Sequence, residues 1–198
     1  RGITVVGNST YRMIPTVHKN YENTVLILTS QVFNYWSSQI FMIQRYERLM
    51  TEIVTFLCSR RNVQVIIKSH PTTDFYSFYE ELAEVFKGRL RHVRQAPLSD
   101  VISLSGMVVI PGIFTTAVLR CLEAGRPVIF FDGVISENCA PDGGEIGVKV
   151  QSMRDFEEAF DNFPKKQTVE VHLATGFQNI IYDSAAFPKE VKDEIYAW

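Results

Sequence analysis

The sequence lacks an excess of basic charge and any long apolar run. Its 198 residues carry 20 Lys and Arg against 22 Asp and Glu, a formal net charge of −2. General binding to nucleic acid is excluded, because that binding depends on excess positive charge. No apolar stretch approaches the roughly 20 residues of a membrane-spanning helix, so any membrane association is expected to be peripheral. The start, Arg-Gly-Ile-Thr-Val-Val, also lacks the layout of a signal peptide.

Cysteine is scarce as well. The three cysteines, Cys58, Cys121 and Cys139, are widely spaced and form no CxxC or Cys/His pattern, and the sequence has no Asp-x-Asp and no His/Asp cluster. These absences predict no metal site, and reduced thiols are typical of a cytoplasmic protein. Internal repeats and low-complexity segments are also missing, so 46% hydrophobic content indicates one well-filled core. The missing initiator Met and the ending Tyr-Ala-Trp suggest a fragment of a longer chain.

What the sequence does contain is a regular alternation of strand and helix patterns. Short β-branched or apolar runs predict strands at 25–28, 63–67, 90–93, 107–110 and 128–131, with an edge strand at 147–150. Apolar spacings of three and four predict helices at 40–57, 98–104 and 115–124. A further helix is predicted to begin after an N-cap at Asp74 and to continue to 86. The last helix is predicted to begin with a capping box of Ser152 and Asp155 and to continue to 160. Segments 134–146 and 161–175 are predicted loops. The alternation indicates an α/β fold: a three-layer, Rossmann-like parallel sheet flanked by helices.

Two strand ends carry polar groups with a chemical use. The strand at 63–67 runs into Lys68-Ser69-His70-Pro71, and Pro71 biases His70 away from helical geometry. The strand at 107–110 runs through Pro111-Gly112 into a helix that begins with Thr115 and Thr116. Parallel strands end at the same edge of a sheet, where open α/β folds bind ligands, and a helix N-terminus binds anions. The expected ligand at this edge is a phosphate group.

Several motifs taken in order resemble a known family. They are Gly7-Asn8-Ser9-Thr10-Tyr11, Lys68-Ser69-His70-Pro71, and Pro111-Gly112 leading to Leu122-Glu123-Ala124-Gly125-Arg126-Pro127-Val128. Over residues 1–160 the chain resembles the carboxyl-terminal donor domain of GT-B glycosyltransferases. Within that family it is most similar to bacterial capsule and surface-polysaccharide transferases, the group of the Kdo, polysialic acid and CDP-glycerol transferases. The resemblance implies one half of a GT-B fold.

The resemblance also implies a site for a nucleotide-activated sugar. In that family the His-Pro motif contacts the phosphate or base, hydroxyl residues at the later helix start hold the phosphates, and a glutamate further along binds the ribose. On this chain the implied donor site consists of Thr29, Ser30, Lys68, Ser69, His70, Gly112, Thr115, Thr116 and Glu123. GT-B folds commonly stabilise the leaving phosphate with a helix dipole and basic side chains, so we expect no metal and no other cofactor. The sequence identifies no catalytic base.

Each of these residues also has an ordinary structural interpretation. His70 before a proline can cap a strand, Thr115 and Thr116 can cap a helix, and Lys68 and Glu123 can be solvated side chains. Two other functions also remain open. One is an enzyme like UDP-N-acetylglucosamine 2-epimerase, which shares the fold but requires extra carboxylates, and the other is a non-catalytic nucleotide-binding or interaction module.

The predicted organisation has three parts: a leading segment at 1–20, the donor nucleotide-binding domain at 21–165, and a helical extension at 166–198. The expected function is the donor half of a metal-independent glycosyltransferase that uses a CMP-, CDP- or UDP-sugar. Its expected partners are the nucleotide-sugar, a missing amino-terminal acceptor domain and a glycan or lipid-linked acceptor. The expected location is the cytoplasm, at the inner face of the membrane where the protein associates with it.

Overall fold

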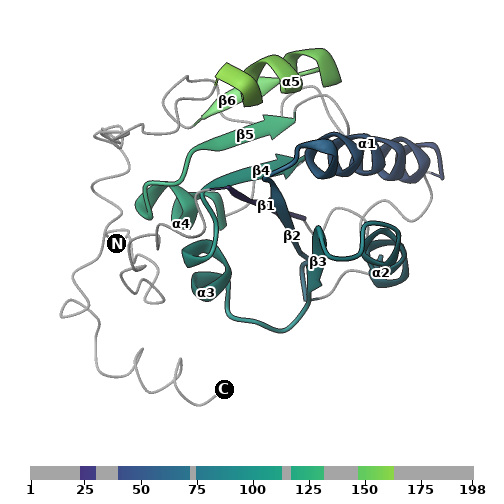
Figure 1. Ribbon diagram of the computed structural model, residues 1–198, viewed down its shortest axis with the longest axis horizontal. Helices are drawn as coiled ribbons and strands as arrows, with labels where there is room; N and C mark the ends of the chain where they lie inside the picture. Colours follow the sequence, from purple (N-terminus) through teal and green to yellow (C-terminus); the bar gives the residue numbers. More distant parts are fainter. Residues whose placement is uncertain (1–22, 30–39, 72–74, 113–116, 132–146, 163–198) are drawn as a thin grey trace, which may run out of the picture. The chain divides into compact units, whose positions relative to one another are not determined.

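The computed structural model describes residues 23–29, 40–71, 75–112, 117–131 and 147–162, which all belong to one compact unit, Ile14–Val169. These residues form a parallel sheet with helices on both of its faces (Figure 1). The predicted leading segment and helical extension lie outside the described residues, as do Ser30, Thr115 and Thr116.

The sheet has six parallel strands in the order β3-β2-β1-β4-β5-β6. The strands are β1 (Thr24–Leu28), β2 (Gln64–Lys68), β3 (Leu90–Val93), β4 (Met107–Pro111), β5 (Val128–Phe131) and β6 (Val148–Val150). The helices are α1 (Ile40–Ser59), α2 (Tyr76–Val85), α3 (Leu98–Ser103), α4 (Ala117–Glu123) and α5 (Met153–Asn162). The predicted fold class, a Rossmann-like parallel α/β sheet, is confirmed.

Two apolar clusters, one on each face of the sheet, explain why the strands read as continuous hydrophobic runs. Val25 and Ile27 of β1 pack with α1, α2 and α5 on the first face, which we call the α1 face. Leu26 and Leu28 pack with α3 and α4 on the second face, which we call the α4 face. Successive strand residues point to opposite faces, and both faces are covered, so every residue of β1 is buried.

The core of the α1 face contains a pair of buried polar groups. Tyr46 of α1 and Tyr79 of α2 are both fully buried, and their hydroxyls lie 3.2 Å apart. Each hydroxyl therefore has a hydrogen-bonding partner where water cannot reach it. Burial raises the pKa of both phenols above the ordinary value, so both stay protonated.

Gly125 terminates α4 as the C′ residue, as the sequence predicts. Gly125 has a φ of +64°, a left-handed conformation that glycine adopts without steric cost. Its N–H donates to Leu122 O at 2.8 Å, and the N–H of Arg126 donates to Cys121 O at 2.8 Å. This pair of bonds is the Schellman motif, which satisfies the last carbonyls of the helix and turns the chain into β5.

Several predicted boundaries were wrong by a few residues. The second strand begins at Gln64 and includes Lys68, so Lys68 is the last strand residue and does not follow the strand. The N-cap of α2 is Phe75 rather than Asp74. Helix α5 continues to Asn162, two residues into the segment predicted as a loop from 161. Element ends are set by tertiary hydrogen bonds as well as by local propensity, which explains errors of this size.

Candidate functional site: the carboxyl edge of the sheet

The strand order places a topological switch point between β1 and β4. From β1 the chain continues to β2 and β3 on one side, whereas β4, β5 and β6 extend on the other. Such a point leaves a crevice outside the carboxyl ends of the two central strands, where open α/β sheets bind ligands. Thr29 follows β1 and Gly112 follows β4, so two of the predicted site residues flank the switch point.

Gly112 has a backbone conformation that favours glycine, and its N–H forms a backbone hydrogen bond. Its φ of +109° lies where residues with a Cβ are strained, and its N–H donates to Phe131 O at 3.1 Å. Gly112 is also buried. These features allow the backbone to turn away from β4 beside the switch point.

Direct hydrogen bonds join the end of β1 to the turn after β2. The N–H of Thr29 donates to Lys68 O at 3.2 Å, and Thr29 Oγ1 accepts the N–H of His70 at 3.3 Å. Four predicted site residues, Thr29, Lys68, Ser69 and His70, therefore lie together next to the switch point. They come from segments some 40 residues apart in the chain, since Thr29 and His70 are separated by 41 positions.

Ser69 is fixed from the neighbouring strand β3. Its N–H donates to Val93 O at 3.3 Å, and its Oγ lies 2.9 Å from Nε2 of His92. The serine is only 1% exposed, so its hydroxyl serves the internal network. Its predicted role in ligand binding stays a prediction.

Lys68 points its ammonium at backbone carbonyls. Nζ donates to Arg94 O at 2.7 Å and to Ser69 O at 3.1 Å. The residue is 8% exposed, and burial lowers the pKa of its ammonium. One N–H donor of this ammonium thus connects the end of β2 to the segment after β3, and a second binds within the turn after β2. The predicted contact between Lys68 and a phosphate stays a prediction.

Two histidines at this edge favour the neutral form. Burial lowers the pKa of His70, and the charge of Lys68 lowers it further. Burial also lowers the pKa of His92, as do Lys68 and Arg94, while Glu80 opposes the shift. At neutral pH both imidazoles are therefore mostly uncharged, and a neutral ring offers one N–H donor and one acceptor. His70 would contact a ligand through hydrogen bonding rather than through full charge.

Sequence reasoning missed two residues that shape this turn, Tyr76 and Arg94. The Tyr76 hydroxyl lies 2.6 Å from Pro71 O and 3.2 Å from His70 O, as their hydrogen-bond donor. The guanidinium carbon of Arg94 lies 3.6 Å from the centre of the Tyr76 ring. One available signal was that Arg94 directly follows a strand parallel to β2, and so must emerge at the same edge.

The remaining predicted site residues are only partly described. Glu123 is the last residue of α4, six residues beyond Ala117 and therefore about 9 Å along the helix axis from its start. Ser30, Thr115 and Thr116 lie outside the described residues. The proposed contacts of these four residues with a nucleotide stay predictions.

The described residues contain neither a membrane-spanning helix nor a cluster of metal ligands. None of the described helices is both long and apolar enough to cross a membrane. In the same part of the chain, no three His, Cys, Asp or Glu side chains gather as metal ligands would.

Comparison with known proteins gives neighbours by structure alone. No protein-family model matches the chain, and no curated protein does. The structure is similar to the crystal structure of the GtfA/B complex, with a TM-score of 0.50 and 14% identity, over 85% of this chain and 34% of that one. It is also similar to accessory secretory protein 1, 2 and 3 of Streptococcus pneumoniae, with a TM-score of 0.51 and 12% identity, over 92% of this chain and 36% of that one.

At this level of identity the likeness shows the fold. The likeness agrees with the Rossmann-like fold class predicted from the sequence. The chain spans about a third of the length of the two neighbours.

Proposed function

We propose that this chain is the donor half of a GT-B glycosyltransferase and binds a nucleotide-activated sugar at the carboxyl edge of its sheet. The proposed donor is a CMP-, CDP- or UDP-sugar, and the proposed product is a bacterial surface or capsule polysaccharide. A further domain would supply the acceptor site, because the chain spans only about a third of its structural neighbours.

One observation carries the proposal. The hydrogen bond from the His70 N–H to Thr29 Oγ1 brings the His-Pro turn against the end of β1, beside the switch point. The resemblance to GT-B donor domains implies that this His-Pro motif binds the donor nucleotide at this edge of the sheet. Open α/β sheets bind their ligands at the switch point, so the position of the motif supports nucleotide binding there.

The chemistry would be displacement at an anomeric carbon with a nucleotide phosphate as the leaving group. Such a step needs a base on the acceptor hydroxyl and donors for the developing negative charge on the phosphate. We assign the second role to the imidazole N–H of His70 and the hydroxyls of Thr115 and Thr116, and we assign the ribose contact to Glu123. The base would come from the acceptor domain.

A thermal-shift panel of CMP, CDP, UDP, GDP and ADP tests the proposal. A nucleotide at about 100 times its Kd should raise the melting temperature by about 5–10 °C, because it binds only the folded state. We expect a cytidine or uridine nucleotide to do so, and His70→Ala to remove the shift.

Arg48→Ala is a matched control, because it removes an exposed cation of α1 that pairs with Glu52. This variant should keep the full shift. If no nucleotide stabilises the wild-type domain, the donor-site proposal fails and an interaction module is favoured. A shift that His70→Ala leaves intact would contradict the site assignment alone.

A further inference from the structure

The turn after β2 is held from both sides of His70. On the amino side, the His70 N–H donates to Thr29 Oγ1 at 3.3 Å. On the carboxyl side, the Tyr76 hydroxyl donates toward His70 O at 3.2 Å and Pro71 O at 2.6 Å. A phenol has one O–H, so the two carbonyls share its proton, and the shorter distance favours Pro71. These bonds restrict both backbone torsions of His70.

Tyr76 is itself held in place by the segment after β3. The guanidinium of Arg94 covers its ring at 3.6 Å, a cation–π distance. The carbonyl of Arg94 accepts a hydrogen bond from Lys68 Nζ at 2.7 Å. Lys68 ends β2, immediately before the turn that Tyr76 binds. The contacts therefore form a closed circuit from Lys68 through Arg94 and Tyr76 to the turn.

We propose that Tyr76 is a positioning residue that sets the backbone of the His70–Pro71 turn, and thereby the place of the His70 imidazole in the donor site. Arg94 and Lys68 keep Tyr76 in its orientation. This inference depends on the proposed function for its effect on binding, but not for its effect on the turn itself. Tyr76 need not touch the nucleotide.

The physical reason is preorganisation. A ring whose backbone is fixed loses less conformational freedom when it contacts a ligand, and so binds it more tightly. Removing the phenolic proton would leave two carbonyls without this donor and let the turn sample other conformations. Since a hydrogen bond of this kind contributes modestly, the expected loss of nucleotide affinity is about 3- to 10-fold.

Tyr76→Phe tests the inference because it deletes the hydroxyl and keeps the ring under Arg94. Ser105→Ala is the matched control, since it deletes a buried hydroxyl that donates to Ile102 O, away from the carboxyl edge of the sheet. We would measure the Kd of the nucleotide that stabilises the wild type, and the NMR shifts and hydrogen exchange of the His70 amide. Tyr76→Phe should weaken binding, speed exchange at His70 and move the pKa of His70 toward its ordinary value. Ser105→Ala should lower stability with Kd unchanged.

The outcomes separate the inference from the proposed function. If the wild type binds a nucleotide and Tyr76→Phe binds it equally with unchanged His70 signals, the inference is overturned and the function stands. If the wild type binds none, the function fails, and the His70 signals alone decide the inference. Should Tyr76→Phe not fold, Arg94→Met removes the exposed guanidinium instead. It should give the same changes at His70, and their absence would overturn the inference.

Discussion

The polar side chains at the end of β2 bind other groups of the protein, both backbone carbonyls and a side chain. Lys68 donates to two carbonyls, and the Ser69 hydroxyl lies 2.9 Å from His92. A buried polar group that lacks a partner is costly, so each of these side chains satisfies a neighbour across the strand ends. In this motif, Lys68 and Ser69 therefore hold the turn, and the turn positions the ring of His70.

Lowering the pH should destabilise the domain through His92. The pKa of His92 lies below its ordinary value, mainly because the ring is buried. The unfolded state, with a His pKa of about 6.5, then binds its proton more tightly than the folded state. The stabilising contribution is therefore full above that pKa and is lost as the pH falls through the folded value. Urea titrations should show a smaller free energy of unfolding at about pH 5.5 than at about pH 7.5.

His92→Gln isolates this effect, because the amide can still hydrogen-bond Ser69 but does not titrate. The loss of stability on acidification should be smaller in this variant than in the wild type. Part of the loss should remain, because the pKa of His70 is lowered by burial as well. An identical pH dependence in both proteins would contradict the prediction.

At the scale of elements, helix α5 depends on its first turn. The Asp155 N–H donates to Ser152 Oγ at 3.2 Å, and the Ser152 hydroxyl donates to Asp155 Oδ2 at 2.7 Å. The predicted pairing of Ser152 with Asp155 is confirmed. Ser152→Ala should lower the free energy of unfolding by about 1 kcal/mol, because it leaves an N–H of the first turn without its acceptor. Chemical denaturation monitored by circular dichroism measures the change.

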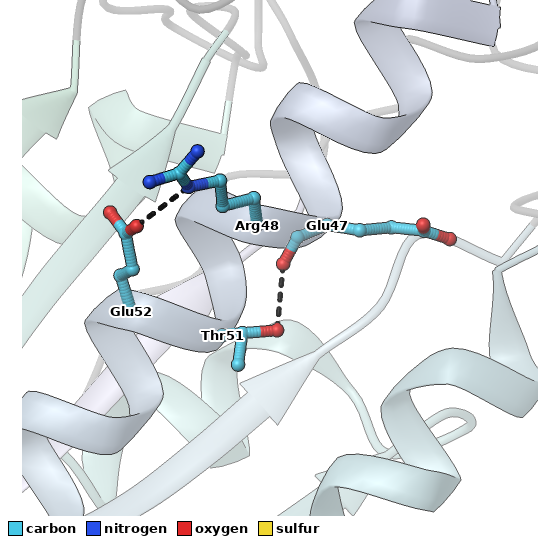
Figure 2. Close-up of polar contacts among 4 residues, drawn as sticks. All are labelled: Glu47, Arg48, Thr51 and Glu52. Atoms are coloured by element: carbon cyan, nitrogen blue, oxygen red, sulfur yellow. Dashed lines mark hydrogen bonds and ion pairs between the residues drawn. The ribbon is translucent and has the colours of Figure 1, made fainter.

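Thr51→Ala gives the matched control on an exposed helix surface. Figure 2 shows the Thr51 hydroxyl directed at the carbonyl of Glu47, at 2.8 Å, beside the pair of Arg48 and Glu52. That carbonyl already belongs to the helix interior, and alanine has the higher helix propensity. The variant should be neutral or slightly stabilised. A loss as large as that of Ser152→Ala would show that any deleted hydroxyl bond has the same effect.

Element existence was easier to predict than element ends. The sequence pattern correctly predicted the strands at 90–93 and 128–131, although every residue of β5 is buried and only Leu90 of β3 is. The start of α2 was misplaced, since Asp74 matched a common N-cap residue type while Phe75 holds the cap position without a side-chain cap bond. Capping preference is a local tendency that tertiary packing can override.

At the scale of the molecule, apolar packing rather than ion pairing attaches α5 to the sheet. Phe156 is fully buried, and its ring lies 5.6 Å from that of Phe56 and 6.0 Å from that of Phe131. Phe156→Ala should cost about 3–5 kcal/mol, because it deletes a large buried side chain and leaves a cavity. Denaturant titrations against the wild type measure the loss.

Asp161→Asn tests the contribution of an ion pair of α5. Arg60, the residue after α1, lies 2.7 Å from Asp161 of α5, with both side chains about half exposed. An exposed pair of this kind contributes less than about 1 kcal/mol. A loss in Asp161→Asn that equals that in Phe156→Ala would contradict the assignment of α5 attachment to the core.

The sequence predicted part of the candidate site for a simple reason. Parallel strands must end at one edge, so the described residues that follow β1, β2 and β4 had to lie at that edge. It could not predict that Tyr76 binds the turn or that Lys68 binds Arg94 O, because those contacts depend on how α2 and the end of β3 dock. In the sequence, Tyr76 has no feature that distinguishes it from the other aromatic residues of the same amphipathic helix.

By itself, the sequence determined the alternation of strands and helices, the parallel sheet and the edge at which its polar motif emerges. Hydrophobic periodicity specifies these features because it records which side of each element is buried. Tertiary structure alone decided the partners: Thr29 for the His70 N–H, Arg94 O for Lys68, and the His70 and Pro71 carbonyls for Tyr76. These pairs join distant segments, and a hydrogen bond depends on distances and angles that no local pattern records.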